Sequence, residues 1–160
     1  MRALCVQHDH VSPTGPISER LRERGFEIDE ILIVDERHAD APNVNFDFPD
    51  ASDYDLLVPM GAPWGAWDDT EIGRWLVPEI AWLRAALEED MPVFGICFGG
   101  QLMSRALGGA VAVARRPEIG WTAVHTDDPE LVASGPWFEF HYDRWTVPAG
   151  AREIARTAAA

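Results

Sequence analysis

Short apolar runs alternate with amphipathic segments along this chain. Continuous or alternating apolar runs are typical of strands, whereas apolar residues three and four positions apart are typical of helices. The strand-like runs are residues 2–7, 26–34, 54–59, 92–96, 110–114, 121–126 and 137–141. The helix-like segments are residues 16–25, 70–90 and 98–107. The order begins β-α-β and predicts parallel strands that are joined by helices.

Proline and glycine residues mark the expected helix ends. Pro16 suits the first turn of a helix, and Gly25 suits the position just after its end. Pro78 interrupts residues 70–90, which predicts a short helix followed by a longer one with Pro78 in its first turn. The Gly108-Gly109 pair ends the helix expected at 98–107.

Strands that alternate with helices predict the α/β class and a three-layer α/β/α sandwich with a mainly parallel, flavodoxin-like sheet. The 160 residues contain no internal repeat or linker, so one domain over 1–160 is expected. Ligands of such sheets bind at the carboxyl ends of the strands. Loops 8–15 and 60–69 and the turn at Cys97 share that edge. The topology therefore predicts a site between these segments.

Composition narrows the possible partners. The net charge of −14 repels nucleic acids and anionic membranes, and no apolar run approaches the roughly 20 residues of a membrane span. Cys5 and Cys97 form no disulfide framework or zinc pattern, so no metal or cofactor is expected. The N-terminus lacks the apolar stretch of a signal peptide. These features predict a soluble cytoplasmic protein with reduced thiols, in which Cys5 is buried in a strand.

The sequence "VFGICFGGQ" places Cys97 between Gly95 and Gly99, where a strand is expected to end and a helix to begin. This pattern is that of a nucleophile elbow with cysteine as the nucleophile. The helix N-terminus is expected to lower the pKa of the thiol, and the backbone N–H of Phe98 is expected to face a developing oxyanion. The alternative is a buried cysteine in a tight strand–helix turn.

Several segments together resemble one family. "PVFGICFGGQLMSRALGGAV" is similar to the nucleophile segment of class I glutamine amidotransferases, whose pattern is G-x-C-x-G-x-Q. "DYDLLVPMGAPWGAWDD" resembles the strand and glycine loop of their oxyanion hole. "RRPEIGWTAV" and "FHYDRWTVPAGAREIART" resemble segments of the subgroup that is like the amidotransferase domain of GMP synthase. The resemblance extends over essentially the whole chain.

The resemblance implies a glutaminase half-reaction. Cys97 would attack the side-chain amide of glutamine, with the oxyanion held by backbone N–H groups near Gly61 and of Phe98. Ammonia would leave for an acceptor bound by a synthetase partner or domain, and water would hydrolyse the γ-glutamyl thioester to glutamate. The residues implied to hold the substrate are Gln101 and the backbone near Phe140 and His141.

A cysteine hydrolase also needs a histidine base. His141, in "EFHYD", is only 44 positions after Cys97 (141 − 97) and is assigned to the substrate loop, because the family's catalytic F-H-P-E-like segment comes later. That segment is absent from the 160 residues, so an incomplete C-terminus with missing strands and little glutaminase activity are expected. His8 and His10 could bind a metal as an H-x-H pair, but no third ligand is apparent, so they are interpreted as polar loop residues.

Other functions stay open at this point. A hydrolase of γ-glutamyl amides or peptides would use the same elbow, and a regulatory module could keep the fold without catalysis. A redox-sensing cysteine is a further alternative, although no resolving cysteine is expected nearby. Trp64 and Trp67 lie in the loop before residues 70–90, where they would form a lid or partner surface, or pack against the following helix.

Overall fold

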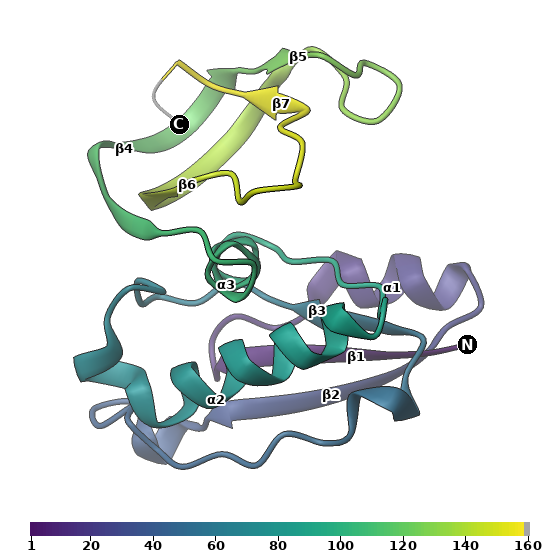
Figure 1. Cartoon of the computed structure of the whole chain (residues 1–160), viewed down its shortest axis with the longest axis vertical. Coiled ribbons are helices and arrows are strands. Elements are labelled where there is room, and N and C mark those ends of the chain that lie inside the picture. The colour runs from purple at the N-terminus through teal and green to yellow at the C-terminus, as the bar shows by residue number, and fades with distance from the viewer. Residues whose placement is uncertain (159–160) are drawn as a thin grey trace.

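A parallel sheet forms the centre of the computed structural model, which describes residues 1–158 (Figure 1). The strand order is β2-β1-β3, with β1 at Arg2–Asp9, β2 at Glu27–Val34 and β3 at Leu56–Pro59. The expected fourth strand at 92–96 follows β3 in parallel, but it forms only an isolated bridge between Leu57 and Val93. Backbone hydrogen bonds nevertheless carry this segment along β3 to the turn at Cys97.

Helices cover both faces of the sheet, as the sequence predicts. On one face Leu4 and Val6 of β1 pack with α2 (Asp69–Glu88) and α3 (Phe98–Ala106). On the other face Cys5 packs with α1 (Gly15–Glu23). Successive strand residues point to opposite faces, so the apolar run of β1 supplies both layers. The α/β/α sandwich is confirmed, and Cys5 is fully buried, with a pKa that burial raises to about 11.

The predicted division of residues 70–90 at Pro78 is wrong. A single helix, α2, extends from Asp69 to Glu88 with Pro78 inside it. Proline removes one helical hydrogen bond, but the residues on both sides of it bury a continuous apolar face. That face consists of Ile72, Trp75, Leu76, Ile80, Leu83 and Ala86. Tertiary packing on the sheet thus keeps the helix in one piece.

The C-terminal strands form antiparallel pairs above α3 (Figure 1). β4 (Val111–Ala123) pairs with β6 (Pro136–Trp145), and the short β5 (His125–Thr126) pairs with β7 (Ala155–Arg156). We call β4 and β6 the ribbon. The sequence predicts separate strands at 110–114 and 121–126, whereas β4 is continuous through 123. An irregularity between Val113 and Glu118 takes the intervening Pro117 out of the ladder.

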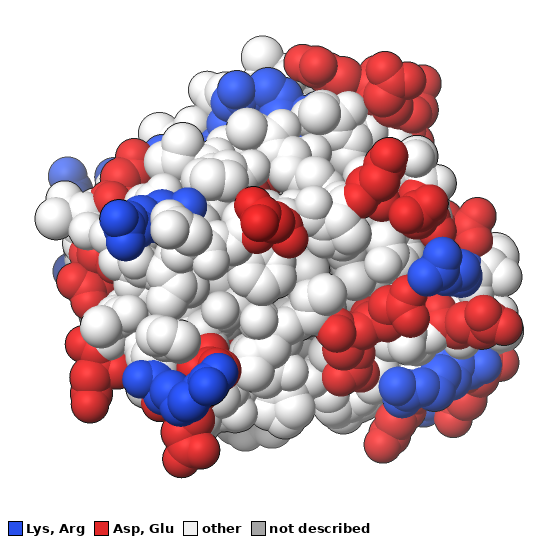
Figure 2. All heavy atoms as spheres, turned by 90° about the horizontal axis from the view of Figure 1, so that it is seen from below, with Lys and Arg blue, Asp and Glu red and all other residues white. Residues whose placement is uncertain are grey.

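Two 3₁₀ turns, η1 (Glu36–His38) and η2 (Ala51–Asp53), lie in the connection between β2 and β3. Figure 2 shows the face seen from below, where acidic side chains and smaller basic groups surround a largely uncharged centre. None of the helices described over residues 1–158 has the length and apolar character needed to cross a membrane.

Candidate functional site

Cys97 occupies a strained position between strand segment and helix. Its φ of 53° and ψ of −107° lie outside the regions that non-glycine residues usually adopt, and it caps the N-terminus of α3. The side chain is exposed. A strained backbone conformation costs stability, and residues that adopt one cluster at functional sites. The strain at Cys97, whose side chain reaches solvent, is therefore consistent with a functional role.

The two glycines beside Cys97 allow the turn to pack closely. A Cβ on Gly95 would lie 2.6 Å from the carbonyl carbon and oxygen of Gly99. A Cβ on Gly99 would overlap the carbonyl oxygen of Pro59 and lie 2.7 Å from its carbonyl carbon. The Gly99 N–H donates to the Met60 carbonyl oxygen at 3.0 Å, so the turn is bonded directly to the end of β3. Because neither glycine has a side chain, the turn can pack closely enough for Cys97 to lie against the loop that follows β3.

The expected lowering of the Cys97 pKa is wrong in its net direction. Desolvation by neighbouring atoms raises the pKa of the thiol although its side chain reaches solvent. The Phe98 N–H favours the thiolate by donating to it, but the negative charges of Asp143 and Glu139 act with desolvation. Asp143 and Glu139 belong to the ribbon, so only the tertiary structure brings them near the thiol.

Replacing Asp143 by Asn is expected to accelerate the alkylation of Cys97 by iodoacetamide at pH 8. Loss of the negative charge lowers the pKa of the thiol, so more thiolate is present below that pKa. The acceleration should be roughly two- to fivefold and should vanish at a pH above the thiol pKa in both proteins. Mass spectrometry of timed samples measures the rate.

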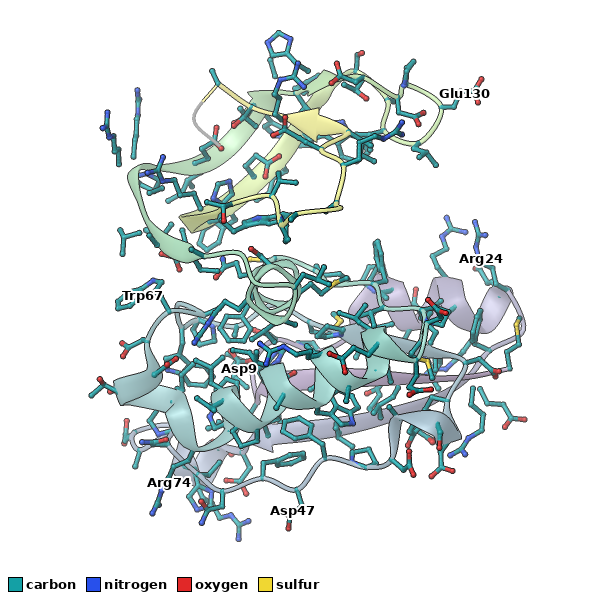
Figure 3. All side chains as sticks on the ribbon, viewed as in Figure 1. Asp9, Arg24, Asp47, Trp67, Arg74 and Glu130 are labelled. Atoms are coloured by element: carbon teal, nitrogen blue, oxygen red, sulfur yellow. The ribbon has the colours of Figure 1, made fainter. Side chains whose placement is uncertain are left out.

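Glu130→Gln is the control for Asp143→Asn, because it makes the same change in net charge. Glu130 lies at the tip of the loop before β6 (Figure 3) and is not among the charges that shift the Cys97 pKa. Equal acceleration by both variants would contradict a local effect of Asp143.

The loop 60–69 follows β3 and lies beside the elbow. A Cβ placed on Gly61 would lie only 3.8 Å from Cβ of Cys97. The buried Gln101 holds this loop, because its Oε1 accepts a hydrogen bond from the Ala66 N–H at 3.3 Å. The Gly61 backbone is therefore held within reach of a group bound to the thiol.

The two tryptophans of this loop have different surroundings. Trp64 packs edge-to-face on Trp75 of α2, with ring centroids 5.7 Å apart. Trp67 extends toward the ribbon (Figure 3), where its Nε1 donates to Asp143 Oδ1 at 3.0 Å. One tryptophan thus packs against the following helix, and the other joins the loop to the ribbon.

A cavity of about 740 Å³ opens in front of the elbow. Cys97 and Gln101 line one side of it, and the ribbon residues Phe140 and His141 line the other. Phe140 is exposed, whereas His141 is partly buried. The residues assigned to the substrate from sequence therefore meet around one cavity.

The ring of His141 is engaged away from Cys97. Its Nδ1 lies 3.0 Å from the carbonyl oxygen of Asp143, which can only accept, so Nδ1 carries a hydrogen. Its Nε2 lies 3.2 Å from Glu118 Oε2. Among residues 1–158 no histidine forms a hydrogen bond with the thiol. This geometry is that of a residue that holds the ribbon.

Sequence reasoning missed a buried pair behind the elbow. His8 is not a polar loop residue but a fully buried one at the end of β1. Its Nε2 lies 3.1 Å from Oε1 of the equally buried Glu79 of α2. A sequence signal existed, because Glu79 falls on the apolar face of its helix, between Leu76 and Ile80. A charged residue at such a position requires a polar partner in the core.

His10, by contrast, is exposed, as expected of a loop residue. Over residues 1–158 no three or more histidine, cysteine, aspartate or glutamate side chains converge in a geometry that could hold a metal ion.

Sequence comparison relates the chain to one family. The family model described as "Glutamine amidotransferase class-I" matches residues 13–156. A protein named GMP synthase [glutamine-hydrolyzing] from Aeropyrum pernix is 39% identical over 77 residues, which are 44% of this chain and 15% of that protein. The chain thus matches about one seventh of this relative's length.

Comparison with solved structures supports the same fold. The glutamine amido transferase of Methylobacillus flagellatus has a TM-score of 0.84 and 26% identity; the match covers 99% of this chain and 62% of that one. A glutamine amidotransferase of Thermotoga maritima has a TM-score of 0.81, with 99% and 68% covered. At 22% identity, the latter likeness supports the fold alone.

Proposed function

Because this chain belongs to the class I glutamine amidotransferase family, we propose that Cys97 attacks the side-chain amide of glutamine. The thiolate sulfur forms a bond to the amide carbon, and the carbonyl π electrons move onto oxygen. When the C–O double bond reforms, the C–N bond breaks, and the amide nitrogen takes up the proton that the thiol gave up and leaves as ammonia. Water then hydrolyses the γ-glutamyl thioester to glutamate and regenerates the thiol.

One observation carries this proposal: a strained cysteine at a helix N-terminus faces a cavity beside the Gly61 backbone. The N–H groups of Phe98 and of the Gly61 loop are the proposed donors to the tetrahedral oxyanion. Preorganised donors of this kind stabilise developing charge because they need no reorientation during the reaction. Gln101 and the ribbon backbone near Phe140 and His141 are proposed to hold the substrate glutamine.

A synthetase is the proposed user of the ammonia. The name of the Aeropyrum pernix relative combines GMP synthesis with glutamine hydrolysis, and this chain matches only 15% of that protein. We therefore propose that acceptor chemistry takes place in a partner or a further domain, and that these 160 residues contribute the cysteine, the oxyanion donors and the glutamine-binding groups of the glutaminase step.

The test uses a chloromethyl ketone analogue of glutamine, in which this ketone replaces the side-chain amide. The thiolate of Cys97 should displace chloride and form one thioether, which mass spectrometry will place on Cys97. Glutamine in excess should slow the reaction, and Cys97→Ser should form no adduct. Buried Cys5 is an internal control that should stay unmodified.

His141→Ala completes this experiment. Because the His141 ring is bonded within the ribbon, the adduct should still form in this variant. Loss of the reaction in His141→Ala as well as in Cys97→Ser would identify His141 as the base instead. A wild-type thiol that reacts with iodoacetamide, but shows no preference for the glutamine reagent and no protection by glutamine, would contradict the proposed function.

The size of the cavity supports a second candidate. The cavity of about 740 Å³ extends from Cys97 along β6 to residues 151–157, so it has room for a group attached to the γ-glutamyl moiety. Hydrolysis of γ-glutamyl amides or peptides would use the same thiol and oxyanion donors. Stronger protection of Cys97 by a γ-glutamyl amide than by glutamine would favour this candidate.

A further inference from the structure

His8 and Glu79 form an ionisable pair inside the core. Both side chains are fully buried, and His8 Nε2 lies 3.1 Å from Glu79 Oε1. Glu79 Oε2 is buried and has no hydrogen-bond partner among the described residues 1–158. Burying such groups is costly, and apolar residues of similar size often stabilise a core equally well. The pair is therefore poorly explained as a stabilising element alone.

The hydrogen bonds of His8 fix the position of one proton of this pair and require a second proton between the two groups. His8 Nδ1 is 3.2 Å from the carbonyl oxygen of Gly61, and a carbonyl oxygen only accepts, so Nδ1 carries a hydrogen. The hydrogen bond between Nε2 and Glu79 needs a second proton on one of the two groups. Imidazolium with carboxylate and imidazole with carboxylic acid both satisfy this arrangement. In either state Glu79 keeps Nδ1–H directed at Gly61.

The same histidine also contacts the elbow. Its ring packs edge-on against the ring of Phe98, with centroids 4.8 Å apart and an interplanar angle of 66°. The Trp75 ring lies on it at 5.6 Å. His8 thus touches both backbone segments proposed to stabilise the oxyanion, one through a hydrogen bond and the other through ring packing.

We propose that His8, oriented by Glu79, is a positioning residue that holds Gly61 and Phe98 in register around Cys97. This inference rests on the proposed function, because it assigns a role in the same oxyanion site. The buried His8 ring does not touch the substrate; it acts through the Gly61 carbonyl and the Phe98 ring. Small displacements of such groups have large effects on rate, since the reaction depends on atomic alignment.

The experiment compares two reagents on the full 160-residue chain. The chloromethyl ketone analogue of glutamine places a carbonyl oxygen in the oxyanion site, whereas iodoacetamide reports only on the access and ionisation of the thiol. Both rates depend on the thiolate fraction, so their ratio removes a change in the Cys97 pKa. His8→Leu and Glu79→Leu should each lower the ratio about tenfold.

Conservative variants separate positioning from packing. Asn at position 8 can place an amide N–H near the position of Nδ1, and Gln at position 79 can donate to Nε2 and retain Nδ1–H. His8→Asn and Glu79→Gln should therefore recover most of the ratio lost in the corresponding leucine variants. Iodoacetamide labelling of the buried Cys5 identifies any variant that unfolds.

The outcomes distinguish this inference from the function on which it rests. A wild-type ratio that persists in His8→Leu, with Cys5 still protected, overturns the positioning role alone. An equal fall of both rates also overturns it, because the effect would then concern the thiol. If recovery fails in both conservative variants while Cys5 stays protected, the hydrogen bonds have no such role. A wild-type chain with no preference for the glutamine reagent overturns both proposals.

Discussion

Gly99→Ala is expected to destabilise the protein by about 3 kcal/mol or more and to abolish the selective reaction of Cys97 with the glutamine reagent. The new Cβ would overlap the carbonyl oxygen of Pro59 at the end of β3. The backbone at this contact cannot shift without losing hydrogen bonds. The Gly99 N–H donates to the Met60 carbonyl oxygen, and the Ile96 N–H donates to the Pro59 carbonyl oxygen. Urea denaturation followed by circular dichroism measures the loss of stability.

Gly100→Ala is the matched control for this prediction. The next residue along α3 would place its Cβ 3.7 Å from the nearest atom, the Gly95 carbonyl oxygen, which is an ordinary contact. Alanine is a better helix former than glycine, so this variant should be unchanged or more stable by about 0.5–1 kcal/mol. Equal destabilisation by both alanines would show that the contact with Pro59 is not the cause.

Trp75→Ala is expected to lower the free energy of unfolding by about 3–5 kcal/mol. Trp75 is fully buried at the centre of the α2 face and packs against the rings of Trp64, His8 and Phe98. Its Nε1 also donates to the Pro42 carbonyl oxygen at 2.9 Å, so the connection between β2 and β3 loses a partner. Chemical denaturation at equilibrium provides the measurement.

Trp121→Ala makes the same chemical change on the ribbon, where the side chain is 74% exposed. Its stability should stay within about 0.5 kcal/mol of the wild type. A loss at Trp121 as large as that at Trp75 would contradict the view that burial in the α2 core, rather than tryptophan content, sets the cost.

Much of the fold could be predicted because each core element carries its own local pattern. The apolar run of β1, the alternation in β2 and the Gly25 and Gly108 stops all correspond to features of the structure; both glycines have φ of 86°. The predicted break of the helix at Pro78 was wrong. The hydrogen bond that Pro78 removes is outweighed by the burial of apolar residues on both sides of it. The ribbon was harder to predict because β4 continues through an irregularity between Val113 and Glu118, where the local pattern indicates two separate strands.

The site divides in the same way. By itself, the sequence determined the elbow, because a cysteine between glycines at a strand–helix junction is a local pattern of backbone requirements. It also identified the family, through the order of several segments. Only the tertiary structure decided the surroundings of the thiol: desolvation by the neighbouring atoms raises its pKa, and the charges of Asp143 and Glu139 on the ribbon add to this effect. The pairing of His8 with Glu79, 71 positions apart, was likewise decided by packing. Electrostatics and buried polar pairs depend on distances between elements, which no local pattern contains.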